Sequence, residues 1–486
     1  MHEMSEFKRV LAVDLGASSG RVIAGTYDGK GIAMEEIHRF PNTPVMLGGH
    51  LHWNVLELYQ QIKQGVKLAC RRYPDILSVS VDTWGVDYGI LDGEGQLLYT
   101  PHHYRDRRMY AVRAELEELL PPEEQFRLSG NQPDPINTVY QLFADWQSNE
   151  ALRSGAERIL LMPDLFHYFL SGVAAAERSI LSTSGLLAAG AAEPSGEVFA
   201  RLGLPERLLP DVVEAGTLIG TLQRELCEEL GCPPLAVIAG ASHDTAAAVA
   251  AVPYRSKEHA AFISCGTWSL VGMETGQPVL SEACYSQGFT NEGCFGGGNR
   301  LLKNITGLWL LQETQRTWAE AGEDYSFAEL TELAERDPSP GSLVDPCDPQ
   351  FAPPGDMPAR IREYCLRTGQ AVPESRGAVV RVIVESLAHA YSEAIAALEA
   401  LTGRSVDTVH MVGGGIKNKL LCQLTADATG KEVVAGPAEA SALGNMLVQL
   451  AALGELDPAH AREAVAASET LEVYRPVRGA SIPGSI

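Results

Sequence analysis

One local pattern, a strand, a short turn of small residues and a second strand, occurs twice in the chain and constrains its fold most strongly. Apolar runs at residues 9–13 and 21–27 flank the turn Gly16–Gly20, and residues 259–264 and 268–273 repeat the arrangement about half the chain later. Two strands joined in this way predict an antiparallel hairpin, whereas a dinucleotide-binding unit would continue into a helix. The repeat therefore predicts two halves of one architecture.

Helices and buried strands alternate after each hairpin, which predicts an α/β protein. The domain boundary is expected near residues 251–257, where Pro253 and polar residues interrupt the apolar pattern, giving domains of residues 1–252 and 253–486. Helices are expected at residues 55–70, 306–321, 379–401, 418–429 and 440–453, and further strands at 78–82, 408–412 and 432–435.

The acidic charge of the chain narrows the choice of partner. Its 486 residues carry a formal charge of −24, which disfavours nucleic acid and anionic membranes. Nine scattered cysteines and the absence of a basic, apolar leader favour the cytoplasm. The apolar stretch 232–254 contains prolines and a glycine, so it is interpreted as a buried strand and helix rather than a membrane span.

The first turn has the composition of an anion cradle. Its backbone N–H groups and the hydroxyls of Ser18 and Ser19 could hold a phosphate, and Asp14 precedes it directly. A carboxylate beside phosphates requires a divalent cation between them, so the pair favours a magnesium–nucleotide site. The alternative is a structural Gly/Ser hairpin.

Two further glycine-containing turns lie in the second half. Thr267 places a hydroxyl in the second hairpin, and Gly413–Gly415 joins a strand to a helix, where a flat ring such as adenine could lie against the backbone. Each could instead be a tight turn that requires a positive φ.

A candidate base, Asp244, follows an apolar strand and opens an alanine-rich helix. His243 and Thr245 flank it within an otherwise apolar stretch, and polar groups gathered in a core are typical of a site. The carboxylate could accept a hydroxyl proton during phosphoryl transfer. The alternative is a helix N-cap.

Together these residues resemble the FGGY carbohydrate kinases of the actin-like ATPase superfamily, over residues 11–474. The motifs that carry the resemblance are Asp14–Arg21, Asp82–Asp87, Leu161–Asp164, Ser242–Thr245, Gly266–Leu270, Thr290–Gly293, Asn304–Gln312, Val412–Gly415 and Gly436–Asn445. The resemblance implies two actin-like (ribonuclease H-like) domains, each a mixed sheet flanked by helices, with the active site in the cleft between them.

The resemblance also implies the chemistry. ATP would phosphorylate the 1-hydroxyl of a ketose, L-rhamnulose first and L-fuculose or L-xylulose as alternatives, with Asp244 as proton acceptor and Mg²⁺ on Asp14. A non-catalytic sugar or nucleotide sensor is the alternative outside enzymes. The implied sugar contacts are Gly85, His243, Asp244, Thr245 and Asn304, and the implied ATP contacts are Ala17, Ser18, Ser19, Gly20, Arg21, Thr267, Gln312 and Gly414.

Overall fold

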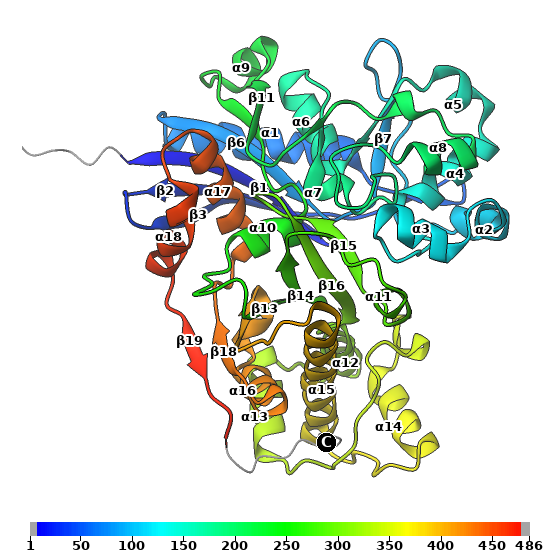
Figure 1. The fold of residues 1–486 in the computed structure, drawn as a ribbon. Helices are drawn as coiled ribbons and strands as arrows, with labels where there is room; N and C mark the ends of the chain where they lie inside the picture. Colours follow the sequence, from blue (N-terminus) through cyan, green and yellow to red (C-terminus); the bar gives the residue numbers. More distant parts are fainter. Residues whose placement is uncertain (1–6, 478–486) are drawn as a thin grey trace, which may run out of the picture. The chain divides into compact units, whose positions relative to one another are not determined.

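The computed structural model describes residues 7–477 and divides into two compact units, which are described separately (Figure 1). The first unit contains residues 7–251, 275–301 and 440–468, and the second contains residues 252–274, 302–439 and 469–477. The sequence-based division at residue 252 differs from this, because it assigned the segments 275–301 and 440–468 to the second domain. They pack within the first unit instead.

The first unit is built on a mixed sheet with the strand order β11-β12-β6-β1-β2-β3. Strands β1, β6 and β12 run parallel, and the pairs β1–β2, β2–β3 and β11–β12 are antiparallel. The strands are β1 (Lys8–Leu15), β2 (Ser19–Tyr27), β3 (Ile32–Pro41), β6 (Ile76–Thr83), β11 (Thr217–Thr221) and β12 (Ala236–Ala239).

Helices cover both faces of this sheet, which explains why residues 10–13 of β1 are all apolar and completely buried. Val22 of β2 packs against Gly65 of helix α1 (Val55–Arg72), and Gly25 packs against Met446 of helix α17 (Ala440–Ala452). Residues three apart in a strand point to opposite faces, so α1 and α17 lie on opposite sides. Figure 1 shows α17 beside β1 and β2 although the chain between them is long.

The first unit has a second apolar core, to which helices α2 and α4 and strands β7 and β8 contribute. Its remaining elements are β4 (Val45–Leu47), β5 (His50–His52), β7 (Tyr88–Leu91), α2 (Arg108–Leu119), α3 (Pro122–Ser129), α4 (Thr138–Ser148), α5 (Glu150–Gly155), β8 (Arg158–Leu161), α6 (Met162–Ser171), β9 (Ala176–Glu177), α7 (Arg178–Leu181), α8 (Gly196–Leu202), β10 (Val212–Val213), α9 (Arg224–Leu230), α10 (Asp244–Ala250), α11 (Glu282–Ser286), β15 (Thr290–Gly293) and α18 (Ala461–Ser468).

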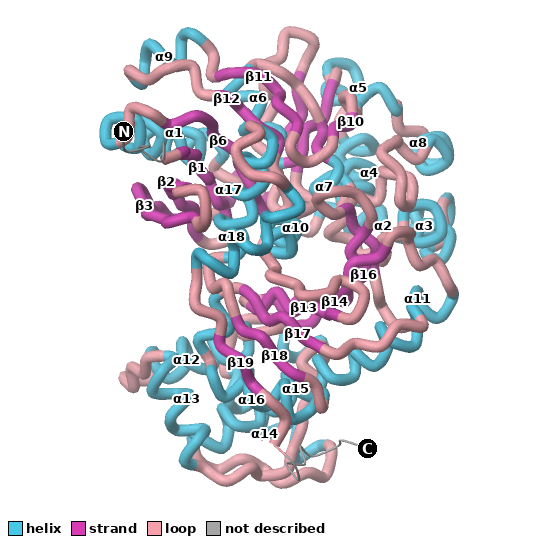
Figure 2. Tube along the Cα trace, turned by 60° about the vertical axis from the view of Figure 1, so that its left-hand side comes forward, coloured by secondary structure: helices cyan, strands magenta, loops and turns pink. Residues whose placement is uncertain are grey.

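The second unit repeats the mixed pattern. Strand β13 pairs antiparallel with β14 and parallel with β17, β17 pairs parallel with β18, and β18 pairs antiparallel with β19, so these strands lie side by side in Figure 2. The elements are β13 (Ala260–Cys265), β14 (Trp268–Thr275), β16 (Asn299–Thr306), α12 (Trp309–Glu320), α13 (Phe327–Arg336), α14 (Met357–Arg367), α15 (Arg376–Thr402), β17 (Thr408–Val412), α16 (Lys419–Thr429), β18 (Glu432–Ala435) and β19 (Glu472–Tyr474). The first residues of β16 belong to the first unit.

Both predicted hairpins are present, and so is the predicted α/β architecture of two mixed sheets flanked by helices. The 232–254 stretch forms β12 and α10, as expected. No helix within residues 7–477 is long and apolar enough to cross a membrane. All nine cysteines lie in this range and are free thiols.

Candidate active site

The first hairpin turn presents the accessible groups that the sequence suggested. Ala17 and Ser18 are exposed and Ser19 is half-buried, while Asn42 donates from its side chain to the carbonyl of Gly16 at 2.9 Å and fixes the turn. Gly20 has a different environment, since a Cβ there would lie 2.4 Å from the Phe40 ring. Packing against Phe40 therefore explains this glycine without a ligand, and its proposed ATP contact would be through the backbone.

Asp14 and Arg21 form an ion pair at the end of the hairpin. They are register partners on β1 and β2, and the Arg21 guanidinium donates to Asp14 Oδ2 at 2.5 Å. From the sequence, only a divalent cation is expected to relieve the repulsion between this carboxylate and phosphates. Arg21 supplies part of that relief from within the protein.

Asp82 is a further acidic residue at the same place, which the sequence analysis did not include in the site. It is the register partner of Asp14 on the parallel strand β6 and is completely buried. Asn445 of α17 donates to Asp82 Oδ2 at 2.6 Å, but Oδ1 has no hydrogen-bond partner. Burial raises the pKa of Asp82 well above its ordinary range, and the negative charges of Asp14 and Asp244 add to the effect.

These carboxylates suit a magnesium ion only in part. The unpartnered, buried Asp82 Oδ1 and the neighbouring Asp14 provide the oxygen chemistry that Mg²⁺ prefers. No group of three or more His, Cys, Asp or Glu side chains within residues 7–477 forms a ready metal cage. One or two carboxylates completed by phosphates and water are sufficient for Mg²⁺, so the residues fit an ion brought with a nucleotide.

The loop that carries Asp244 is held by buried hydrogen bonds. Thr83 at the end of β6 donates its N–H to the Ser242 carbonyl at 3.0 Å, and the Ser242 N–H donates to the buried Glu177 carboxylate at 3.1 Å. Asp244 begins α10, and the Thr245 N–H donates to its Oδ1 at 2.6 Å. The Asp244 side chain is about one-third exposed (36%), so it can reach a substrate from a fixed backbone.

His243 lies between Asp244 and a buried ion pair. Its Nε2 is 3.4 Å from Asp244 Oδ1, and its Nδ1 is 3.0 Å from Arg300 Nη2. The same Nη2 donates to Glu292 Oε2 at 2.6 Å. Burial raises the pKa of Glu292, but its hydrogen bonds and charged contacts, the Arg300 guanidinium among them, outweigh burial and lower the pKa to about 2.

Arg300 was not predicted from the sequence to have a role, and Glu292 was identified only as part of a family motif. No local pattern identifies Arg300, because its strand gives no sign that a completely buried guanidinium faces the base. The side chains of Asp244, His243, Arg300 and Glu292 nevertheless all belong to the first unit.

The turn that carries Gly85 is backbone-strained. Val86, which follows it, has a φ of 68°, a value that β-branched residues rarely adopt. Thr138 donates to the Val86 carbonyl at 2.7 Å, and the Val86 N–H donates to Thr183 Oγ1 at 3.3 Å. Strain held in this way is typical of functional sites, which is consistent with the proposed sugar contact at Gly85.

In the second unit the structure brings three of the proposed ATP residues together around the second hairpin. Thr267 donates from Oγ1 to Gln312 Oε1 at 3.1 Å. A Cβ on Gly413 or Gly415 would lie 3.0 Å and 2.2 Å, respectively, from atoms of Cys265, beside the same turn, whereas one on Gly414 would meet nothing within 4 Å. Gly414 is therefore the glycine of this loop with room for a ligand.

Asn304 has a different setting from the other proposed sugar contacts. It is exposed on β16, in the part of that strand that belongs to the second unit. Gly85, His243, Asp244 and Thr245 all belong to the first unit.

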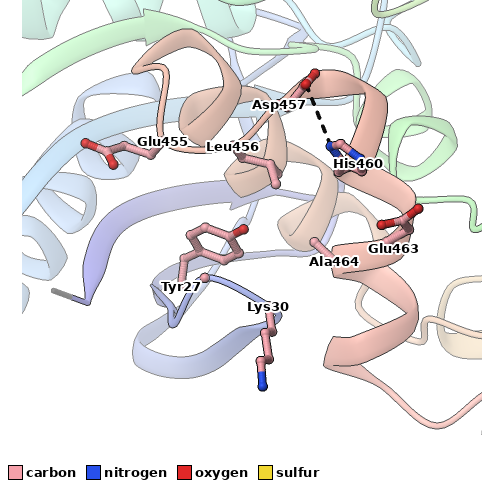
Figure 3. A pocket seen from close by; sticks show the side chains of 9 residues that line it. Tyr27, Lys30, Glu455, Leu456, Asp457, His460, Glu463 and Ala464 are labelled. Carbon is pink, nitrogen blue, oxygen red and sulfur yellow. Dashed lines mark ion pairs between the residues drawn. The ribbon is translucent and has the colours of Figure 1, made fainter. Parts of the chain in front are cut away.

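A cavity of about 260 Å³ lies away from these residues (Figure 3). Tyr27 and Lys30 of the β2–β3 hairpin line it on one side, and Asp457, His460 and Glu463 line it on the other. None of the proposed site residues lines this cavity. It is therefore not a candidate for the chemistry.

Comparison with known proteins identifies the class. Residues 9–251 match the N-terminal domain and residues 261–453 the C-terminal domain of the FGGY family of carbohydrate kinases, so the chain belongs to this family. It is accordingly a carbohydrate kinase, an enzyme whose substrates are a sugar and ATP.

Individual relatives are similar over nearly the whole chain. A rhamnulokinase of Bacteroides thetaiotaomicron is 41% identical over 96% of this chain and 95% of its own length. One of Enterococcus faecalis is 40% identical over 97% and 95%. The solved structure of gluconate kinase from Lactobacillus acidophilus matches with a TM-score of 0.79 at 15% identity, covering 97% of this chain and 94% of that one, which supports the fold alone.

Proposed function

We propose that the protein is a rhamnulokinase, which transfers the γ-phosphoryl group of ATP to the 1-hydroxyl of L-rhamnulose. The observation that carries this proposal is the identity of 41% and 40% to two rhamnulokinases over at least 95% of both chains. Kinases for L-fuculose or L-xylulose and a non-catalytic sensor are not favoured by these relatives. A cytoplasmic location, expected from the sequence, stays a prediction.

Asp244 acts as the base in this proposal. As the sugar 1-oxygen bonds to the γ-phosphorus and the bond to the ADP oxygen breaks, the hydroxyl proton passes to the Asp244 carboxylate. The hydrogen bonds of the Thr245 and Ser242 backbone N–H groups support this role, because they fix the position of the carboxylate that must contact the sugar hydroxyl. Gly85, His243, Thr245 and Asn304 would bind the sugar.

ATP would be bound by the two hairpin turns and the glycine loop. The proposed residues are Ala17, Ser18, Ser19, Gly20 and Arg21 in the first unit and Thr267, Gln312 and Gly414 in the second. Mg²⁺ would be held by Asp14 and would neutralise phosphate charge. Arg21 supports the same function, since its guanidinium balances Asp14 and can donate to phosphate oxygens.

A coupled ADP-release assay with magnesium and ATP tests the proposal. The sugars would be L-rhamnulose, L-fuculose, L-xylulose, D-xylulose and glycerol, and we expect kcat/KM to favour L-rhamnulose at least about tenfold. Preference for another ketose would overturn the substrate, and no turnover of any sugar would overturn the kinase mechanism.

Asp244→Asn tests the base. The amide keeps the shape but cannot accept the proton, so kcat should fall at least about a hundredfold. The exposed Asp211→Asn in the same unit is the matched control and should keep its turnover. Near-normal turnover in Asp244→Asn would contradict the assignment.

A further inference from the structure

The buried pair of Arg300 and Glu292 stands directly behind the proposed catalytic loop. Arg300 is completely buried, and its Nη1 donates to the Gly293 carbonyl at 2.6 Å while Nη2 donates to Glu292 at 2.6 Å. A buried ion pair is often no more stabilising than well-packed apolar residues would be. Stability is therefore a poor explanation for a charge placed behind the active site, and the contacts of the guanidinium suggest another role.

The contact of Arg300 with His243 bears on which ring nitrogen of the imidazole carries the proton. A guanidinium has only donors, so the nitrogen that faces it must accept. Nη2 has two hydrogens: one is directed to Glu292 Oε2 at 2.6 Å and the other can reach His243 Nδ1 at 3.0 Å. With Nδ1 as acceptor, the single proton of a neutral imidazole is on Nε2.

The opposite ring nitrogen faces the proposed base. His243 Nε2 is 3.4 Å from Asp244 Oδ1, and Glu292 Oε2 is 3.3 Å from Nδ1. Without Arg300, the negative Glu292 would be the charged neighbour of Nδ1 and would attract the proton to that side. Nε2 would then turn a lone pair toward the Asp244 carboxylate, which would repel it.

We propose that Arg300, oriented by Glu292, is a positioning residue that keeps the proton of His243 on Nε2, the ring nitrogen that lies 3.4 Å from Asp244 Oδ1. This arrangement places an N–H donor beside one carboxylate oxygen and so favours one orientation of the group that accepts the hydroxyl proton. The inference rests on the proposed function of Asp244, but the state of His243 is a property of the protein alone and can be measured without a substrate.

The direct test is nitrogen NMR of the full-length protein with isotope-labelled histidine. His243→Gln identifies the signals of His243 among the 12 histidines by their loss. In the unsubstituted protein we expect an unprotonated Nδ1 and a protonated Nε2. A protonated Nδ1, in a neutral ring or an imidazolium, would overturn the proposal, and this measurement does not depend on any variant at Arg300.

Variants then test the cause. In Arg300→Met the proton should move to Nδ1, and adding Glu292→Gln should return it to Nε2, because an amide N–H can donate to Nδ1 in place of Arg300. Arg108→Met is the matched control: it also removes a buried guanidinium, there paired with Asp145 at 2.7 Å, and should leave the His243 signals unchanged. An unchanged tautomer in Arg300→Met would refute the role.

Kinetics separate the two proposals. Arg300→Met should lower kcat at least about tenfold with the KM for ATP within about twofold, and the double variant should recover part of kcat. If His243 carries its proton on Nε2 but the protein phosphorylates no ketose, the proposed function is refuted and the effect of Arg300 on His243 still stands. An unchanged kcat together with a moved proton would refute the positioning role.

Discussion

Asp87 gives a quantitative test of the electrostatics beneath the Gly85 turn. Its carboxylate is completely buried and accepts hydrogen bonds from the Trp53 and Trp84 indoles at 2.6 Å and 3.0 Å and from Gln141 at 2.9 Å. Burial nevertheless outweighs these bonds and raises the pKa of Asp87 to about 6. At a pH between 3.8 and about 6, the folded protein therefore holds a proton on Asp87 that the unfolded chain has already lost.

The sign and size of the effect follow from linkage. The folded state binds the extra proton between the ordinary pKa of 3.8 and the folded value of about 6, so stability falls as the pH rises through this window and is level above it. One step in pKa is worth about 1.4 kcal/mol, so ionising Asp87 in the folded protein costs about 3 kcal/mol at pH 7.

Asp87→Asn removes this titration. Its amide oxygen can accept from the two indoles at any pH, although its N–H₂ group faces Gln141 and costs a pH-independent hydrogen bond. The free energy of unfolding, from urea titrations, should therefore shift in favour of the variant by about 2.4 kcal/mol between pH 4 and pH 7, relative to the unsubstituted protein. The exposed Asp211→Asn is the control and should produce no comparable trend. A constant difference across this range for Asp87→Asn would refute the reasoning.

Two other predictions concern nucleotide binding. Asp14→Ala should raise the magnesium concentration for half-maximal activity at least about tenfold in a titration at fixed ATP, and an unchanged requirement would contradict its metal role. Gly414→Ala should leave unfolding unchanged and raise the KM for ATP, because its new methyl group meets only open space that ATP is proposed to use. Gly415→Ala should destabilise the protein by about 1–3 kcal/mol in urea unfolding, since the methyl group would overlap Cys265; the same result for both glycines would contradict this distinction.

Local patterns predicted the strands, both hairpins and the major helices because periodicity and small-residue turns act within a few residues. The 27-residue helix α15, for example, ends before Gly403, which has a φ of 67°. The same local chemistry indicated Asp14, Ser18 and Thr267. The proposed role of Asp244 as the base still required the family resemblance, since its position alone was also consistent with a helix cap.

Contacts between distant segments could not be predicted in this way. Arg300 reaches His243 across 57 positions, and Asn445 reaches Asp82 across 363. Each pair is set by how the strands and helices pack, and neither residue stands in a sequence pattern that differs from an ordinary strand or helix. The segmentation of the two units escaped prediction for the same reason.

Helix α17 has a consequence for biosynthesis. Gln449 donates to the Leu11 carbonyl at 2.8 Å, and Gly444 is so close to Ala247 that a Cβ would lie 1.8 Å from its carbonyl oxygen. A ribosome therefore has to translate beyond residue 439, through most of the second unit, before the segment that covers one face of the first sheet is made. Until then, the central strand β1 of the nascent first unit has been synthesised, but α17 does not yet cover it on that face. A fragment that ends at residue 251 would keep this apolar surface exposed permanently.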